Sequence, residues 1–286
     1  MEGTIDALDV LDARQFQIVI RRLADSLSYG TDHSPFLGSG IEFVQSRPYQ
    51  PGDPVRAIDW RVTARTGRFH VKEFESPKRM PVYLVIDTSA SMTVSSAKKS
   101  KYATALFLAG GIALACLDRV SPVGVIGVGG RRLLVRPSLS KTEIMEWLLR
   151  LKTFLYDEET RLSERLGEIT PSLTNRHLLI VLSDLHDPTS LGALRRLSQI
   201  HDTAVLQLQD PAEVNLRGAG LIRAREAETG EEFWTHGRRQ HVDQEELTAA
   251  FRRGGIDHLL LRTDADYVSS VRHFFESRGV LGRKGR

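Results

Sequence analysis

Short apolar runs alternate with amphipathic segments from residue 81 to the end of the chain. Runs of this length, rich in branched side chains, are typical of strands covered on both faces, and they occur at PVYLVID (81–87), VGVIGVGG (123–130), HLLIVLSD (177–184), TAVLQLQD (203–210) and HLLLRT (258–263). Helical spacing predicts helices over about 98–117, 141–151, from 162, and over 190–200, 245–253 and 267–278. The alternation predicts an α/β fold with a doubly wound, mostly parallel sheet.

A different pattern precedes this region. Apolar positions recur at helical spacing over residues 6–27, which predicts an amphipathic helix. Over residues 29–81, short β-like pieces are separated by turn residues, and we expect a small β-rich annex there. We therefore predict an N-terminal helix and annex over residues 1–79 and a main domain over residues 80–286. The main domain is expected to carry a β-hairpin insertion around residues 218–236.

Composition excludes several classes of protein. The chain is 41% hydrophobic and 26% charged, as expected of a soluble globular protein, and its formal net charge of +3 is dispersed, so nucleic acid is not an expected partner. Cys116 is the single cysteine, which excludes an internal disulfide and fits a reducing compartment. The first residues lack the pattern of a signal peptide, and the uncharged stretch 102–117 is too short to span a bilayer. We expect a cytoplasmic protein without a membrane span.

Polar oxygen ligands follow two of the predicted strands. Asp87, Ser89 and Ser91 alternate directly after the first strand, and Ser183 and Asp184 end the strand at 177–184. Ligands of open parallel sheets bind at the carboxyl ends of the strands, so these side chains are expected at one edge. Carboxylates and hydroxyls are the hard ligands that Mg²⁺ prefers, with Mn²⁺ or Ca²⁺ as alternatives.

The DxSxS pattern of Asp87, Ser89 and Ser91 resembles the metal-ion-dependent adhesion site (MIDAS) of von Willebrand factor type A domains, which have a Rossmann-like fold. The resemblance implies a threonine and a second aspartate that complete the site. Asp184 matches the aspartate, and Thr160 is preferred over Thr142 as the threonine. By analogy, the serines and the threonine bind the ion directly, and the aspartates act largely through waters. One position then stays open for an Asp or Glu of a partner.

A wider resemblance covers most of the chain. Residues 42–43, 47–53, 56, 58–60, 64–65 and 71–75, followed at once by the metal motif, resemble the bacterial domain-of-unknown-function fifty-eight family. That family is associated with AAA+ ATPases of the MoxR type. The resemblance implies a metal-dependent adaptor or co-chaperone of such an ATPase, acting in complex assembly or maturation on a client protein that presents Asp or Glu.

Enzymatic function is the alternative. Asp184 and His186 form the Asp-x-His that opens the site of metal-dependent phosphoesterases, but the later histidines lack the contexts that such enzymes require. The sequence also contains no GxxxxGK[ST] phosphate loop and no GxSxG nucleophile elbow. We therefore expect a binding protein and not an enzyme.

The annex allows two interpretations. Arg56, Asp59, Trp60 and Arg65 are charged or aromatic residues around a Pro-Gly turn, as in a binding surface. They are equally typical of a structural unit in which Asp53 or Asp59 pairs with an arginine and the tryptophan anchors the annex on the main sheet.

Overall fold

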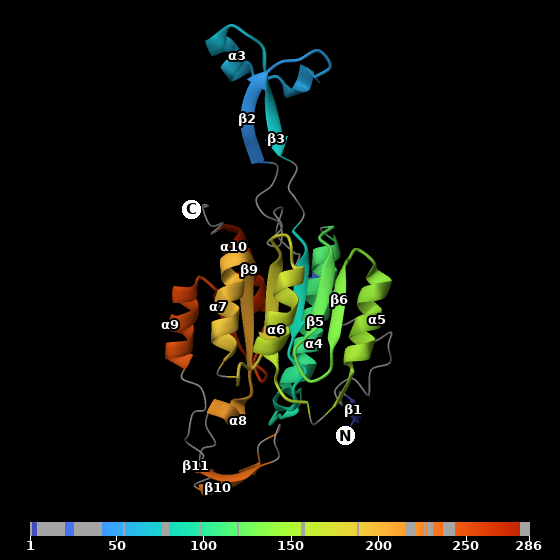
Figure 1. Ribbon diagram of the computed structural model, residues 1–286, viewed down its shortest axis with the longest axis vertical. Coiled ribbons are helices and arrows are strands. Elements are labelled where there is room, and N and C mark those ends of the chain that lie inside the picture. The colour runs from blue at the N-terminus through green and yellow to red at the C-terminus, as the bar shows by residue number, and fades with distance from the viewer. Residues whose placement is uncertain are drawn as a thin grey trace.

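The structure is a computed structural model that describes residues 2–4, 21–25, 42–53, 55–75, 80–97, 99–118, 120–155, 158–187, 189–214, 221–225, 227, 231–236 and 244–280. A six-stranded sheet forms its centre (Figure 1). The strand order is β12 (Asp257–Arg262), β9 (Asp202–Gln209), β8 (Leu178–Ser183), β4 (Val82–Ile86), β5 (Val123–Gly127) and β6 (Leu133–Ser138). All neighbours are parallel except β6, which pairs antiparallel with β5. The predicted α/β fold with a mostly parallel sheet is confirmed.

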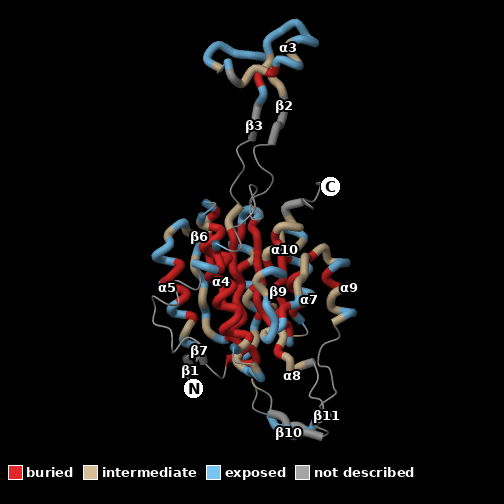
Figure 2. Tube along the Cα trace, turned by 180° about the vertical axis from the view of Figure 1, so that it is seen from behind, coloured by how far each residue is buried: buried red, intermediate tan, exposed pale blue. Residues whose placement is uncertain are grey.

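Helices cover both faces of this sheet. Successive strand residues point to opposite faces, so Leu84 packs in one core and Val85 in the other. The first core also takes residues of α4 (Lys101–Asp118), α5 (Lys141–Leu151) and α10 (Val268–Val280). The second takes residues of α6 (Leu162–Ile169), α7 (Ser190–Ile200) and α9 (Gln244–Gly254). Figure 2 shows buried residues concentrated in α4 and in the strands.

Helix α4 is the central helix of the first core. Among the described residues it is the one helix long and apolar enough to cross a bilayer, and 89% of that stretch is buried inside the fold, as in the core helix of an α/β domain. Leu23 packs on it so closely that a Cβ at Gly111 would lie 2.5 Å from the leucine Cγ. Residues 21–25 are helical, and the rest of the helix predicted over 6–27 lies outside the described residues.

The annex contains a helix that the sequence pattern did not predict. Strands β2 (Glu42–Pro48) and β3 (His70–Glu75) pair antiparallel, but between them residues 55–57 form a 3₁₀ turn and α3 spans Trp60–Thr66. The β-like pieces expected at the two ends of this segment are confirmed by β2 and β3, but the expectation of β structure over residues 56–66 is wrong. Asp59 caps α3 by accepting hydrogen bonds from the backbone N–H groups of Arg61 and Val62, and Gly67 ends it with φ 70°.

Two smaller antiparallel pairs complete the described structure. Strand β1 (Glu2–Thr4) pairs with β7 (Thr153–Leu155), and β10 (Leu221–Arg225) pairs with β11 (Glu232–His236) in the region of the predicted hairpin insertion. The short helix α8 (Pro211–Val214) follows β9. Because β3 leads into the amino end of β4, the annex joins the sheet at the edge opposite the carboxyl ends of the parallel strands. Figure 1 shows the annex at one end of the molecule and α8 near the other.

The carboxyl end of α4 carries a strained residue. Val120 has φ 60°, and its N–H and that of Ser121 donate to the carbonyls of Leu117 and Cys116 at 2.8 and 2.9 Å, the pattern of a Schellman cap. Glycine is the usual residue at this position, since a β-branched side chain is unfavourable in the left-handed region.

Val120→Gly is therefore expected to raise the free energy of unfolding by about 1 kcal/mol, because the strain is relieved and Val120, at 39% exposure, loses little packing. Urea denaturation measures the change. Val94→Gly is the control, because Val94 is also exposed but has φ −67°, and we expect it to lower stability. Equal effects of the two substitutions would contradict the explanation.

Candidate functional site

The loop after β4 turns three polar side chains inward. Asp87 and Ser89 are fully buried and Ser91 is 8% exposed. An Asp87 carboxylate oxygen (Oδ1) accepts a hydrogen bond from the Ser89 backbone N–H at 3.0 Å, and the hydroxyls of Ser89 and Ser91 lie 3.0 Å apart. The 3₁₀ turn at Ala90–Thr93 produces this compact arrangement. One short segment thus offers a carboxylate and two hydroxyls to the same place.

The end of β8 meets this loop. Strands β4 and β8 are parallel neighbours, so Ser183 and Asp184 reach the same edge as Asp87. The Ser183 hydroxyl donates to Asp87 Oδ2 at 2.5 Å, and the Asp184 carboxylate is hydrogen-bonded to Ser91. Ser183 also accepts the N–H of Leu185 at 2.9 Å, which holds that buried residue in a left-handed conformation with φ 61°. Asp87, Ser89, Ser91 and Asp184 are therefore brought together.

The two candidate threonines lie at opposite edges of the sheet. Two residues before Thr160, the carbonyl of Glu158 accepts the N–H of Ala90 at 2.8 Å, and the N–H of Arg161 donates to Val128 at 2.9 Å. The segment of Thr160 therefore lies against the motif loop. Thr142 is exposed in the first turn of α5, just after β6, whose last residue pairs with the first residue of β5. That end of β6 is at the edge opposite the motif.

A buried lysine completes the group of charges. Lys101, the first residue of α4, is fully buried, and its ammonium donates to Asp184 Oδ2 at 2.8 Å and to the carboxylate of Glu213 in α8. We did not predict Lys101 as a site residue. Its signal in the sequence is a cation at the amino end of an apolar helix, where the helix dipole disfavours positive charge unless carboxylates compensate.

His186 lies at the exposed side of the same group. Its Nδ1 is 3.8 Å from Asp184 Oδ2, and its Nε2 is 3.9 Å from Glu213 Oε1. Ligand atoms of these three residues lie within 4.8 Å of one another, a spacing that can hold a metal ion. The Lys101 ammonium contacts both carboxylates, however, so a cation already occupies this part of the cluster and offsets some of its negative charge.

The charged groups at the carboxyl edge of the sheet shift one another's pKa values. Burial, and after it the charge of Asp184, raises the pKa of Asp87 to about 7. Burial also acts to raise the pKa of Asp184, but Lys101 and His186 outweigh it and lower that pKa. Burial acts to lower the pKa of Lys101, and the carboxylates of Asp184 and Glu213 raise it above its usual value. The cluster thus holds the three carboxyl groups of Asp87, Asp184 and Glu213 against one ammonium, so a divalent cation bound there would meet an excess of acidic groups.

A second layer of hydrogen bonds supports the motif loop. The Thr88 hydroxyl donates to Glu158 Oε2 at 2.9 Å and accepts the N–H of Gly129 at 3.1 Å. The same Glu158 oxygen accepts the N–H of Arg131 at 3.0 Å, and Glu158 is only 4% exposed. A Cβ at Gly129 would overlap Thr88 and Glu158. This network fixes the segment of Thr160 to the loop of Asp87.

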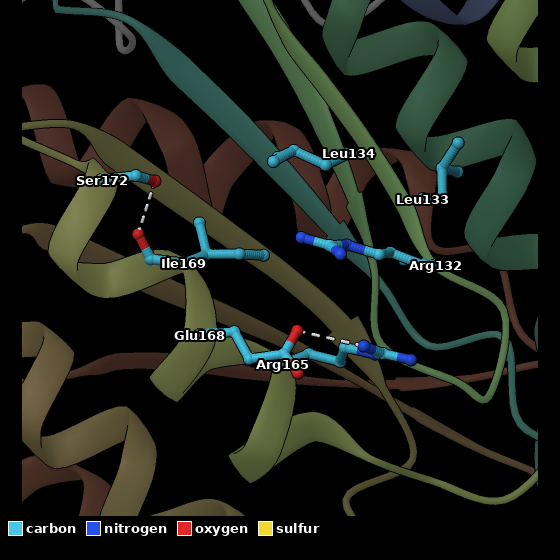
Figure 3. Close-up of a pocket in the computed structure, with 8 residues that line it drawn as sticks. Arg132, Leu133, Leu134, Arg165, Glu168, Ile169 and Ser172 are labelled. Carbon is cyan, nitrogen blue, oxygen red and sulfur yellow. Dashed lines mark hydrogen bonds and ion pairs between the residues drawn. The ribbon is translucent and has the colours of Figure 1, made fainter.

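A pocket lies beside the site and not in it. Figure 3 shows it between the end of β5, the start of β6 and α6, and it is lined by Gly127, Arg132, Leu133, Leu134, Arg165, Glu168, Ile169 and Ser172. Arg165 forms an ion pair with Glu168 at 3.0 Å and donates to the carbonyl of Gly130. None of the predicted metal ligands lines this pocket.

Comparisons with known proteins agree with part of the sequence analysis. The chain is 26% identical over 293 residues to uncharacterised proteins of Mycobacterium bovis (Mb1516) and Mycobacterium tuberculosis (Rv1480), which covers 97% of this chain and 92% of theirs. Among solved structures, BatB from Bacteroides thetaiotaomicron matches with a TM-score of 0.48 and 16% identity, over 70% of this chain and 99% of that one. The RO (RSR) protein of Deinococcus radiodurans matches with a TM-score of 0.36 and 15% identity, over 94% and 49%. The family model described as "Protein of unknown function DUF58" matches residues 45–254, well over half of the chain, and the protein therefore belongs to the DUF58 family.

Proposed function

We propose that this protein is a metal-dependent protein-binding module with a type A-like, MIDAS-like site. The observation that carries the proposal is the convergence of Asp87, Ser89, Ser91 and Asp184 at the carboxyl edge of the sheet, with the Thr160 segment bonded to the same loop. The donor set consists of hydroxyl and carboxylate oxygens, which suits Mg²⁺, Mn²⁺ or Ca²⁺ better than zinc.

The proposed division of roles follows the donor chemistry. Ser89, Ser91 and Thr160 would hold the ion directly, and the two aspartates would hold its waters. When bound, the ion supplies a positive charge with an exchangeable position that a carboxylate can take. The single ammonium of Lys101 offsets part of the negative charge of Asp184 and Glu213, so the remaining negative charge stays moderate and an acidic group of a partner is attracted, not repelled. We propose a client protein or a MoxR-type AAA+ ATPase as that partner, with the chain as its adaptor in complex assembly.

Metal binding is tested by titration calorimetry with magnesium and with manganese. Asp87→Ala is expected to abolish the heat seen with the wild type, because it removes the carboxylate that is hydrogen-bonded to both the motif loop and Ser183. Asp118→Ala removes an exposed carboxylate at the far end of α4 and should leave the heat unchanged. Equal heats from the wild type and Asp87→Ala would remove the metal from the proposal. Co-purification with a MoxR-type ATPase, lost on chelation and in Asp87→Ala, tests the partner separately.

Hydrolysis of a phosphodiester is the second candidate. The spacing of Asp184, His186 and Glu213 favours it, and the Lys101 ammonium between the two carboxylates argues against a second metal there. Turnover of a chromogenic phosphodiester with manganese that is abolished by His186→Ala would favour the enzyme. We expect no such turnover.

A further inference from the structure

The outer end of the annex carries an exposed aromatic cluster. Trp60 and Phe69 are 63% and 57% exposed, Tyr49 is 37% exposed, and Val55, in the 3₁₀ turn before α3, is 67% exposed. The ring of Phe69 lies edge-to-face between the other two, with centroids 6.5 Å from Tyr49 and 6.4 Å from Trp60. The prediction that Trp60 anchors the annex on the main sheet is wrong, because most of its surface faces solvent.

The aromatic cluster is held in place from within the annex. Asp53 forms a two-point ion pair with Arg47 at 2.8 Å, as one interpretation of the sequence expected. Asp59 caps α3 and accepts the Ser46 hydroxyl at 2.6 Å. The strand pair, the cap and the ion pair therefore fix the backbone that carries the rings. Rings ordered before contact lose little conformational entropy when a partner binds.

The charge around the rings is positive. Arg61, Arg65 and Arg68 are exposed, and none of them forms an ion pair within the described part of the chain. The neighbouring carboxylates are already used, Asp53 by Arg47 and Asp59 by the helix cap and Ser46. Three exposed arginines thus share the segment of residues 60–69 with Trp60 and Phe69, and no described carboxylate pairs with them. Tryptophan, tyrosine and arginine are the residues that contribute most to binding energy at protein interfaces.

We propose that Tyr49, Trp60, Phe69, Arg61, Arg65 and Arg68 form a docking surface for an acidic surface of a partner protein. The aromatic rings fill an apolar pocket of the partner, and the guanidinium groups pair with Asp or Glu around it. This surface goes beyond the proposed metal site, since the annex joins the opposite edge of the sheet. Anionic lipid is a weaker match, because recognition of lipid headgroups generally uses clusters of about four to eight basic residues.

Site-specific photo-crosslinking tests the docking surface in the full chain, expressed in its own host. p-Benzoylphenylalanine replaces Trp60 or, as a control, Ile200, which is 58% exposed at the end of α7. We expect position 60 to crosslink to one protein, on a segment that mass spectrometry shows to be rich in Asp and Glu, and position 200 not to. Arg61→Glu/Arg65→Glu in the same chain should reduce the product at least fivefold, and Arg252→Glu/Arg253→Glu, a matched pair of exposed arginines on α9, should not.

The crosslinked segment, made as a peptide, then serves as the probe for fluorescence anisotropy. Trp60→Ala and Arg61→Glu/Arg65→Glu should each weaken binding at least tenfold, and Asp87→Ala should leave it unchanged, which separates this surface from the metal site. Circular dichroism checks that each variant is folded, and the arginine pair still tests the idea if Trp60→Ala unfolds the annex. Crosslinks to phospholipid, to a second copy of the chain or to a segment without acidic residues would overturn the proposal, as would equal products from positions 60 and 200 or no product.

Discussion

Lys101→Met is expected to lower the free energy of unfolding by about 3–5 kcal/mol, measured by urea denaturation in the presence of chelator. The methionine fills a similar volume but leaves Asp184 without its ammonium partner. The side chains of Lys101 and Asp184 are 1% and 0% exposed, so water cannot replace the lost contact, and Glu213 loses its partner at the same time.

The control for this prediction is a substitution of Lys99, which lies two residues before Lys101 in the chain. Lys99 is exposed, with its ammonium 5.0 Å from the centre of the Phe107 ring, and Lys99→Met is expected to cost less than about 1 kcal/mol. Asp184→Asn removes the carboxylate charge that Lys101→Met leaves without its ammonium partner. The double variant Lys101→Met/Asp184→Asn should therefore be more stable than Lys101→Met alone. A loss below 1 kcal/mol for Lys101→Met, or no rescue by Asp184→Asn, would show that the lysine contributes packing and not charge.

Gly129→Ala is expected to cost roughly 2–3 kcal/mol of stability and to weaken magnesium binding. The new methyl group overlaps the Thr88 hydroxyl and the Glu158 carboxylate, so the hydrogen bond between them has to break. Glu158 would then be buried with fewer partners, and the loop of Asp87 would lose its link to the segment of Thr160. Thermal unfolding measures the first effect and calorimetry with magnesium the second.

The adjacent glycine provides the comparison for this substitution. A Cβ at Gly130 would meet the Glu158 Cγ at 3.5 Å, an ordinary van der Waals contact, and Gly130→Ala should change stability by less than about 0.5 kcal/mol. Equal effects of Gly129→Ala and Gly130→Ala would show that glycine is needed in this turn for its backbone freedom. The hydrogen bonds of Thr88 and Glu158 would then not depend on the close approach of residue 129.

The central strands were predictable because they are buried on both faces. The residues of β4 are at most 5% exposed, and such a strand has to be a continuous apolar run. Helix α3 was missed, although Asp59 and Gly67 are a usual start and end for a helix. Its seven residues carry aromatic and β-branched side chains and bury none of them, so no apolar periodicity marks it.

The candidate site was predictable only where its residues follow strands. Parallel strands β4 and β8 bring Asp87 and Asp184 to one edge, and this follows from topology alone. Lys101 and Glu213 depend on contacts between residues 83 and 112 positions apart, which no local pattern encodes. Thr160 remains a prediction as a ligand, although the fold brings its segment to the motif loop.

Strand β4 has the annex at its amino end and the motif loop at its carboxyl end. It is hydrogen-bonded on both sides, to β5 and β8, and its five residues span about 16 Å. A strand clamped in this way cannot flex independently of the sheet. Because the annex precedes this strand in the chain and the motif loop follows it, a molecule engaged at the annex and one engaged at the motif loop would not compete for the same surface.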